Sequence, residues 1–514
     1  MTFGLDFMAF FGPLKRVYLL CCVFLSPGFQ VLLAQSLEQE LQSVLEENNI
    51  IGATVLSICQ NQPADVFNFG YSDLNNNIEI SNNTYFRIAS ISKLVTAIGL
   101  LNLCEEGYCD LDEPINNYLP YEVRNQNYPN VSITFRMLLT HTSTLNDGST
   151  YSAFLNASYN QMPPPNISEI LVEGGDYFNN NMFLNQVPGQ YFQYANINYG
   201  LIATLIEAIS EIRFDLYMKQ LLFDPLDIDG SFNIQDLQNI ENLAVLYRDA
   251  IPQADNYNGI MPEPPEYANY EIGSNGLLFA PQGGLRISAG DLAKIMSLMM
   301  NDGIGINDAL EDIQILNAAS VDSMLENNWT YNGSNGNNYY NLFNSWGLGV
   351  HRITNTNQGD IVFSDVSMFG HPGEAYGLLS DLYFKENNDY GFIFITNGYY
   401  PGGSYQFGEN SAFYQVEEDV FSVLRNYSFS PCVNLTVNVP NYNNKIYPNP
   451  ANHVIHLNQG DWSSFTMRDL NGRVVLSSKT PSDLISVAHL KSGLYFYEII
   501  KAQQSLTGKI IIDR

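Results

Sequence analysis

The chain has 514 residues, of which 45% are hydrophobic and only 15% charged. This length predicts roughly two to four domains, and the composition excludes a chain that is disordered throughout. The formal net charge of -31 argues against nucleic acid as a partner, because a phosphate backbone would be repelled.

The first part of the chain has the pattern of a secretion signal peptide. Lys15 and Arg16 form a basic start, an apolar run follows, and Ala34 provides a small residue at the cleavage position. A membrane anchor is the alternative, which Pro27 weakens because proline interrupts a spanning helix. We therefore expect residues 1–34 to be a signal peptide and the protein to be exported.

Four cysteines follow this predicted signal peptide. Cys104 and Cys109 flank EEGY, a predicted helix end and turn, and an exported protein permits a disulfide. Their spacing has no accompanying histidines and is not a zinc pattern. The sequence leaves open whether the two thiols are bridged.

The elements that follow the signal begin with a helix and a strand pair. Residues 36–49 have helical periodicity, and residues 52–60 and 64–74 are predicted to form two strands joined by a turn. From Lys93 the chain runs KLVTAIGLLNLCEEG, which is apolar on nearly every side until Glu105. Such a pattern is typical of a helix buried in the middle of a domain.

The middle of the chain alternates between loops and helices. Residues 150–185 are rich in Asn, Pro and Tyr and predict a long surface excursion, whereas residues 199–210 predict a helix. Residues 288–303 predict a second helix with a serine cap at its start and a glycine at its end. We expect substrate specificity to lie in the loops at 146–186 and 250–275.

The last third of the chain contains two regions of strands. Strands dominate residues 346–396, and a closing helix is predicted at 411–427. Together with the earlier elements they predict an α/β (α+β) domain over residues 36–428, with one sheet and a helical region. After a linker at 429–443, short strands separated by turns predict a small β-sandwich over residues 444–514.

Ser90 and Lys93 form the first candidate pair for chemistry. Residues three apart share a helix face, so Lys93 can reach the Ser90 hydroxyl. Serine is a weak nucleophile until a base takes its proton, and burial lowers a lysine pKa enough for it to act as that base. The alternative is a serine that caps the helix beside a solvated lysine. A Ser-x-x-Lys motif that occurs alone favours this alternative. Here Lys93 starts an apolar helix, which argues against a solvated lysine.

The segment YFQYANINYG places Tyr194 and Asn196 just before a helix. A phenol beside a cationic lysine can share its proton as a general acid or base, and an asparagine amide can bind a substrate ester or amide. Aromatic packing with a helix cap at Asn196 is the alternative interpretation.

The segment GHPGEAYG carries His371 and Gly373 in a predicted strand close to a turn. Gly373 allows a substrate backbone to approach closely, and the next amide, of Glu374, can donate to an oxyanion. A strand end with a surface histidine is the alternative. The sequence contains neither a His-x-x-x-His pair nor a phosphate-cradling glycine loop, and we predict no metal site and no cofactor.

The order Ser-x-x-Lys, Tyr-x-Asn and His-x-Gly resembles the serine β-lactamase and penicillin-binding-protein superfamily. The likeness is greatest to its branch of class C β-lactamases, D,D-carboxypeptidases and family VIII esterases. Flanking segments resemble this branch too: FRIASISKLVTA, ITFRMLLTHTSTL, VPGQYFQYANINYGLIATLIE, PQGGLRISAGDLAKIM and FGHPGEAYG. The resemblance covers about residues 36–426. It implies a β-lactamase/transpeptidase-like fold with an antiparallel sheet, flanking helices and a helical subdomain.

The resemblance also implies a role for each candidate residue. Ser90 becomes the acylating nucleophile, Lys93 its base or electrostatic partner, and Tyr194 a shared general base and acid. Asn196 orients substrate, and His371 takes the place of a lysine or histidine in the third motif. The implied reaction is acyl transfer to water through a covalent acyl-enzyme, without metal or cofactor.

Two residues depart from the family pattern and bear on the substrate. The amides of Ser90 and Glu374 are implied to form the oxyanion hole, but Pro372 stands where many members have threonine. Glu374 stands where β-lactamases commonly have a small residue, and its carboxylate suits a neutral ester or an amine-bearing substrate. We therefore expect an esterase or D-amino-acid peptidase acting on a small-molecule, ester or peptide substrate. The alternatives are a true β-lactamase, a D,D-carboxypeptidase and a catalytically silent binding module.

The tail has a resemblance of its own. IYPNPANHVIHL, RDLNGRVVLSS, ISVAHLKSGLYFYEII and KIIIDR resemble the type A sorting domain of the type IX secretion system of Bacteroidota. The match covers about residues 445–514. It implies interaction with the secretion machinery, passage through the outer membrane, and release or attachment at the cell surface. A carbohydrate-binding or adhesive β-module is the alternative, and the oligomeric state is left open.

Overall fold

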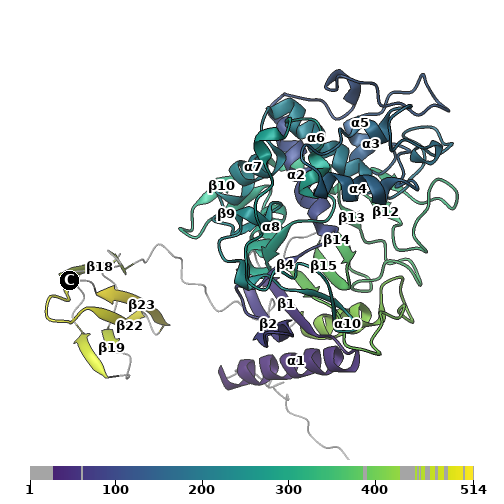
Figure 1. Ribbon diagram of the computed structural model, residues 1–514. Coiled ribbons are helices and arrows are strands. Elements are labelled where there is room, and N and C mark those ends of the chain that lie inside the picture. The colour runs from purple at the N-terminus through teal and green to yellow at the C-terminus, as the bar shows by residue number, and fades with distance from the viewer. Residues whose placement is uncertain are drawn as a thin grey trace, which may run out of the picture. The chain divides into compact units, whose positions relative to one another are not determined.

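The computed structural model of the chain describes residues 27–59, 62–385 and 390–428, and parts of the segment 446–512. The chain divides into two compact units between Ser428 and Phe429 (Figure 1). Most of the predicted signal peptide and the whole predicted linker lie outside the described residues, so both stay predictions. Within the described part, no helix combines the length and the apolar character needed to cross a membrane.

A nine-stranded antiparallel sheet forms the centre of the larger unit. Its strand order is β11-β12-β13-β14-β15-β16-β1-β2-β3. Because β16 pairs with β1, segments from the two ends of this unit's sequence lie side by side in the middle of the sheet. The strands are β1 (Gly52–Cys59), β2 (Gln62–Asp73), β3 (Ile78–Glu79), β11 (Trp329–Thr330), β12 (Ser345–Trp346), β13 (His351–Arg352), β14 (Met368–Ala375), β15 (Leu378–Lys385) and β16 (Tyr390–Thr396).

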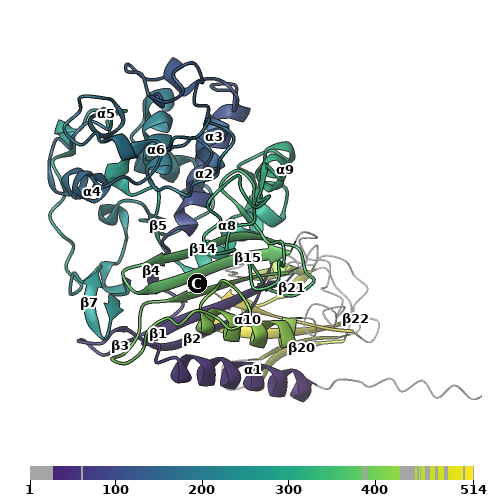
Figure 2. The same ribbon diagram turned by 90° about the vertical axis from the view of Figure 1, so that its right-hand side faces the viewer.

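Helices cover both faces of this sheet, as Figure 2 shows. On one face α1 (Pro27–Glu47) lies against α10 (Gln415–Ser428), and the ring of Phe421 in α10 packs on the aromatic rings of β15 and β16. On the other face lie α2 (Ile91–Glu105) and α8 (Ala289–Met300). The centre of the sheet is therefore buried on both sides, and every residue of β1 and β16 is buried.

The helical region is built around α2 and α6 (Ile197–Ser210), which pack against each other. Twelve residues of α2 are buried, as its apolar sequence predicts. A disulfide between Cys104 and Cys109 ties the last turn of α2 to the turn that follows it, which is one of the two alternatives left by the sequence. The other helices of this region are α3 (Phe135–Leu139), α4 (Tyr151–Asn160), α5 (Ser168–Leu171), α7 (Phe214–Met218) and α9 (Ala318–Leu325).

Residues 150–185 differ from the predicted surface excursion. They form α4 and α5, and the side chains of Phe154 and Ile170 are buried in the main core. The three prolines at 163–165 lie between the two helices, whereas Asn156 and Asn160 lie within α4. Averaging over the whole segment therefore hides the few apolar residues that hold the helices to the core.

The helix ends show how local hydrogen bonds set the boundaries. Ser288 caps α8 as predicted, because its Oγ accepts the amide of Asp291 at 3.0 Å. The closing helix α10 begins at Gln415 rather than 411, where the Glu417 carboxylate accepts the amide of Tyr414 at 2.6 Å. Helix α1 extends nine residues further toward the N-terminus than predicted, since its first residue is a proline, which suits the start of a helix.

The smaller unit contains two antiparallel sheets, with orders β17-β18-β21 and β20-β19-β22-β23. Buried apolar side chains such as Ile455, Phe465 and Ile510 form its own core. The predicted small β-domain is confirmed as a separate set of strands with a core of its own. Its strands are β17 (Ile446–Tyr447), β18 (Val454–Leu457), β19 (Ser464–Arg468), β20 (Val474–Ser478), β21 (Leu484–Ser486), β22 (Gly493–Lys501) and β23 (Gln504–Ile512).

Candidate active site

Ser90 lies in the turn between β4 (Tyr85–Arg87) and α2. The preceding Ala89 has φ +43°, a left-handed conformation that costs energy for a residue other than glycine and recurs at functional turns. The Ser90 hydroxyl makes no capping hydrogen bond to the first turn of α2. The helix-cap alternative therefore does not describe this serine.

Lys93 lies in the first turn of α2 with none of its surface exposed. Its Nζ donates hydrogen bonds to Ser90 Oγ at 2.9 Å and to the Gln282 carbonyl oxygen at 2.7 Å. Burial lowers the pKa of Lys93 to about 7, and the nearby charge of Asp147 opposes this only in part. A large fraction of this lysine is therefore a neutral amine near pH 7, which can accept a proton from the serine.

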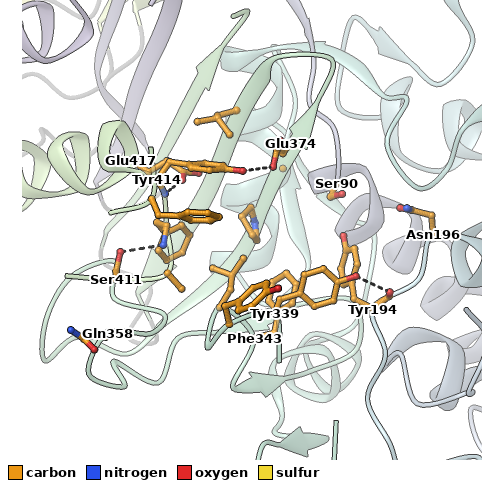
Figure 3. Close-up of a pocket in the computed structure, with 18 residues that line it drawn as sticks. Ser90, Tyr194, Asn196, Tyr339, Phe343, Gln358, Glu374, Ser411, Tyr414 and Glu417 are labelled. Atoms are coloured by element: carbon orange, nitrogen blue, oxygen red, sulfur yellow. Dashed lines mark hydrogen bonds between the residues drawn. The ribbon is translucent and has the colours of Figure 1, made fainter. Parts of the chain in front are cut away.

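Tyr194 lies in the loop before α6, beside Ser90 and Asn196 (Figure 3). The centre of its ring is 4.8 Å from Lys93 Nζ, and the ring packs on His141 at 4.4 Å and on Phe343 at 5.1 Å. Burial raises the pKa of Tyr194 well above 10, although a hydrogen bond with Ser90 acts in the opposite direction. The phenol therefore keeps its proton at neutral pH and can donate it.

Asp147 holds Asn196 in place, a role that no local sequence pattern indicates. Its carboxylate accepts the amides of Asn196 and Ile197, each at 2.9 Å, and Asn196 Nδ2 at 2.8 Å. Asp147 thus caps α6, whereas the Asn196 side chain makes no cap and lines the cavity instead. An acid before a glycine indicates only a turn, and 49 residues separate Asp147 from Asn196.

His371, the residue of the third motif, is fully buried and does not line the cavity. Its ring centre lies 6.1 Å from that of Tyr194 and 5.3 Å from that of Trp346. Burial, and then the charge of Lys93, holds its pKa well below 6.5, so the ring is neutral. Side chains alternate along β14, so Pro372 faces the cavity while the His371 ring points behind Tyr194.

Gly373 marks the place where β14 meets the Ser90 turn. A Cβ atom on Gly373 would lie 2.4 Å from Ser380 Oγ, 2.8 Å from the Ile88 carbonyl oxygen and 3.0 Å from the Ser90 nitrogen. Only glycine permits this approach of backbone to backbone. The close approach at Gly373 brings the Ser90 amide next to β14, the strand that carries the Glu374 amide. These two amides are the predicted oxyanion donors.

The backbone of β14 presents an open edge at this place. The Met368 carbonyl accepts the amide of Ile353 from the β13 side, and the register with β15 continues without a shift. Backbone groups of Pro372 and Glu374 therefore also point away from β15. Pairing with β13 extends only as far as Gly370, so proline costs no ladder bond here and the Glu374 amide points out of the sheet.

These elements surround a cavity of about 790 Å³ (Figure 3). The cavity brings together residues from the first turn of one helix, the start of another and a strand, as the sequence motifs predicted. Lys93 and His371 lie behind its surface. The predicted residues that line it are Ser90, Tyr194, Asn196, Gly373 and Glu374.

The remaining walls come from segments that the sequence did not single out. Most of them belong to residues 339–343 and 407–417, and neither 146–186 nor 250–275 contributes a lining residue. Neither predicted loop therefore lines the cavity, because loop length and composition do not reveal which side of a fold a loop reaches. Asp147, in the first of them, contacts the cavity only through Asn196. Among the residues that the structure describes, no group of His, Cys, Asp or Glu could hold a metal ion.

Family models match both units of the chain. The model described as beta-lactamase matches residues 36–413, and that of the secretion system C-terminal sorting domain matches residues 445–513. The sorting domain indicates export by the type IX secretion system, to the cell surface or outside the cell.

Curated relatives match part of the chain. Protein flp of Staphylococcus aureus strain NCTC 8325 is 25% identical over 192 residues, which are 37% of this chain and 36% of that protein. A beta-lactamase of Yersinia enterocolitica is 26% identical over 217 residues, which are 41% of this chain and 50% of that protein. The matched part thus spans a third to a half of the length of these relatives.

Solved structures match most of the chain in fold. The octameric penicillin-binding protein homologue from Pyrococcus abyssi has a TM-score of 0.55 and 18% identity, over 93% of this chain and 96% of its own. D-alanine carboxypeptidase AmpC from Burkholderia cenocepacia has a TM-score of 0.54 and 17% identity, over 78% and 99%. D-amino acid amidase from Ochrobactrum anthropi SV3 has a TM-score of 0.54 and 18% identity, over 76% and 99%. With the family model spanning most of its length, this chain belongs to the beta-lactamase family and carries a type IX secretion sorting domain at its C-terminal end.

Proposed function

We propose that this protein is an exported serine hydrolase that cleaves an ester or amide through an acyl-enzyme on Ser90. One observation carries the proposal: the Nζ of the fully buried Lys93 lies 2.9 Å from Ser90 Oγ. A lysine with a pKa of about 7 is an effective base near neutral pH. The pair thus meets the requirement for an activated serine nucleophile.

In the acylation step, Ser90 Oγ bonds to the substrate carbonyl carbon as its proton passes to Lys93. The carbonyl oxygen becomes an oxyanion between the amides of Ser90 and Glu374. Collapse of this intermediate breaks the bond to the leaving group, which takes a proton from the Tyr194 phenol. The proton held by Lys93 then replaces the one that Tyr194 gave up. Asn196, fixed by Asp147, orients the substrate.

Deacylation repeats these steps with water as the nucleophile. The water gives a proton to the Lys93 and Tyr194 pair as its oxygen bonds to the acyl carbon. The second oxyanion collapses by breaking the bond to Ser90 Oγ, which regains a proton. The products are a carboxylic acid and the free enzyme, and no step uses a metal or a cofactor.

The charges on the cavity wall favour a neutral or amine-bearing substrate. Two carboxyl side chains, Glu374 and Glu417, line the cavity that holds Ser90. The carboxylate of a β-lactam or of a peptide C-terminus would meet the carboxylate of Glu374 at this wall. We therefore propose an esterase or D-amino-acid peptidase in preference to a β-lactamase or D,D-carboxypeptidase.

A panel of p-nitrophenyl esters, nitrocefin and D-alanyl peptides tests this function. We expect turnover of at least one ester or amide and an acyl adduct on Ser90 by mass spectrometry. Ser90→Ala should abolish both, whereas Ser404→Ala, which changes an exposed serine outside the cavity, should retain both. Turnover by Ser90→Ala would contradict the mechanism. If no probe acylates the intact protein, it is a silent binding module instead.

A further inference from the structure

A pair of carboxyl groups lies buried at one wall of the cavity. Glu417, in the first turn of α10, is 3% exposed, and Asp381 in β15 has no exposed surface. Neither a backbone amide, a hydroxyl group nor a basic side chain of the described residues donates to Asp381, whose carboxyl group instead shares a hydrogen bond with that of Glu417. Glu417 also accepts the amide of Tyr414. The two buried acids therefore depend largely on each other, which requires that they share a proton.

No basic group stabilises the ionised form of this pair. Burial, and then the charge of Glu417, raises the pKa of Asp381 well above its usual value. Burial also raises the pKa of Glu417 to about 8. The interactions that act on the two groups come from other acids, from backbone and from each other, and none comes from a lysine or arginine. The pair therefore keeps its protons at neutral pH, and a cation that entered here would stabilise the ionised carboxylate of Glu417 and displace a proton.

Glu417 is the member of the pair that lines the cavity, and a third acid, Glu374, lines the cavity as well. The Tyr414 hydroxyl donates to Glu374 Oε2 at 3.0 Å, while the amide of the same residue donates to Glu417. Figure 3 shows Glu374, Tyr414 and Glu417 grouped on the side of the cavity away from Tyr194. Tyr414 therefore holds two carboxyl groups on one wall of the space into which Ser90 opens.

Aromatic rings border this acidic wall. Phe407 is 73% exposed, and its ring stacks on that of Tyr414 at 5.4 Å between centres. Phe413 also lines the cavity next to them. Ring faces attract cations, and together with carboxylates they favour an ammonium group that is attached to an apolar chain.

We propose that Glu374 and Glu417, with Asp381 behind Glu417, bind an ammonium group of the substrate. This inference rests on the proposed hydrolase function, and it narrows the substrate class to esters or amides that carry a primary amine on an apolar chain. The burial of Asp381 and Glu417 without a lysine or arginine acting on them is the observation that separates this wall from an ordinary acidic surface. The ammonium supplies the positive charge that the described residues around the pair do not.

Esters of matched length test the proposal. We would compare p-nitrophenyl 6-aminohexanoate with p-nitrophenyl heptanoate, which has a methyl group in place of the ammonium. The wild-type kcat/KM should favour the amino ester by about tenfold. Glu417→Gln should lower this ratio toward one, and Glu374→Gln should lower it too. Glutamine keeps the acceptor for the Tyr414 amide, and a thermal melt of each variant checks that the fold is retained.

Glu409→Gln is the matched control. It removes an exposed carboxylate from the loop that precedes α10, outside the cavity, and should leave the ratio at its wild-type value. If the heptanoate ester is hydrolysed through Ser90 as fast as the amino ester, the ammonium site is wrong while the proposed function stands. If Glu417→Gln leaves the ratio of the two kcat/KM values unchanged, the proposed ammonium site is wrong as well.

Binding to the Ser90→Ala protein separates the two proposals if no ester is turned over. Hexylammonium should bind to this variant in calorimetry, and hexanol, its neutral analogue, should bind about tenfold more weakly. Adding Glu417→Gln to the same protein should remove that difference. Equal affinity for hexylammonium and hexanol would overturn the ammonium site without reference to catalysis.

Discussion

Lys93 Nζ is held 2.9 Å from Ser90 Oγ and 2.7 Å from the Gln282 carbonyl, and neither of these acceptors is a carboxylate. A neighbouring carboxylate in contact would raise the lysine pKa and keep the amine charged. Without one in contact, burial dominates and the pKa falls to about 7. The serine is therefore paired with a base that can exist in its neutral form at the pH of the cell exterior.

The first prediction concerns the pH dependence of hydrolysis. Below a pH of about 7 Lys93 is protonated, and each unit of acidification should lower kcat/KM for a neutral ester about tenfold. Above that pH the rate should level off. The buried His141 and His371 do not account for a limb near pH 7, because burial holds the pKa of each well below 6.5. Initial rates between pH 5 and 9 provide the measurement.

Two variants test whether Lys93 causes the decrease of kcat/KM below a pH of about 7. Lys93→Arg carries a side chain that cannot lose its proton in this range, so activity should fall at least a hundredfold. Glu417→Gln removes the cavity carboxyl whose pKa is raised to about 8 and should leave the limb near 7 in place. A flat wild-type profile from pH 5 to 9 would rule out Lys93 as the base.

The second prediction separates the chemistry of Tyr194 from its packing. Tyr194→Phe keeps the ring that packs on His141 and Phe343 but removes the phenol. We expect kcat to fall about a hundredfold or more, as for the loss of a general acid, with the midpoint of urea unfolding unchanged. Single-turnover kinetics and a denaturation curve give the two readouts. A variant that loses stability instead of kcat would show that the residue acts only as a packing element.

The third prediction concerns Asp147 as a positioning residue. Asp147→Ala leaves the amides of Asn196 and Ile197 without their acceptor, so the free energy of unfolding should fall by about 1–2 kcal/mol. Asn196 loses its anchor as well, so KM should rise more than the loss of stability explains. Asp322→Ala, on the exposed side of α9, is the control and should change stability by less than about 0.5 kcal/mol. Equal effects of the two variants would contradict the role of Asp147.

The fourth prediction concerns the stability of the site's framework in acid. Asp255 is buried and accepts hydrogen bonds from Arg87 at 3.0 Å and from Arg286 at 2.8 Å. Burial acts to raise its pKa, but the charges of the two guanidinium groups hold that pKa well below its usual range. The ionised carboxylate of Asp255 therefore contributes its full stability to the fold above about pH 4, and this contribution declines as the pH falls further.

Removing this carboxylate should be costly at neutral pH. Asp255→Asn leaves two arginines without their counterion and should lower the free energy of unfolding by about 3–5 kcal/mol at pH 7. The difference from wild type should shrink at pH 3, since the wild-type contribution declines in acid. Asp308→Asn, in an exposed pair with Lys294, should cost less than about 1 kcal/mol at either pH. Urea unfolding of the three proteins at both pH values makes the comparison.

Local patterns carried the predictions that succeeded. The apolar run after Lys93 defines α2 and its burial, and Ser90 precedes it at a spacing that only a helix turns into a contact. The strands of the central sheet were equally visible, because buried strands are continuous apolar runs. These features depend on neighbours within a few positions of the chain, which a sequence displays directly.

Contacts between distant segments escaped prediction. Asp147 acts on Asn196 across 49 residues, and Tyr414 donates to Glu374 across 40, so no local pattern joins either pair. The orientation of His371 depends on the phase of β14, which a one-residue slip would invert. Glu417 looked like an ordinary acid in the first turn of a helix, and only the tertiary fold buries it beside Asp381.

The close approach at Gly373 has a consequence for how such a protein diversifies. The nucleophile turn and β14 are spaced there by main-chain atoms, with room for a hydrogen and nothing larger. The spacing between the Ser90 amide and β14 therefore does not depend on the side chains of residues 339–343 and 407–417, which form most of the cavity walls. Substitutions in those walls can accumulate and redirect the protein to new substrates, while the spacing that supports the chemistry is inherited unchanged.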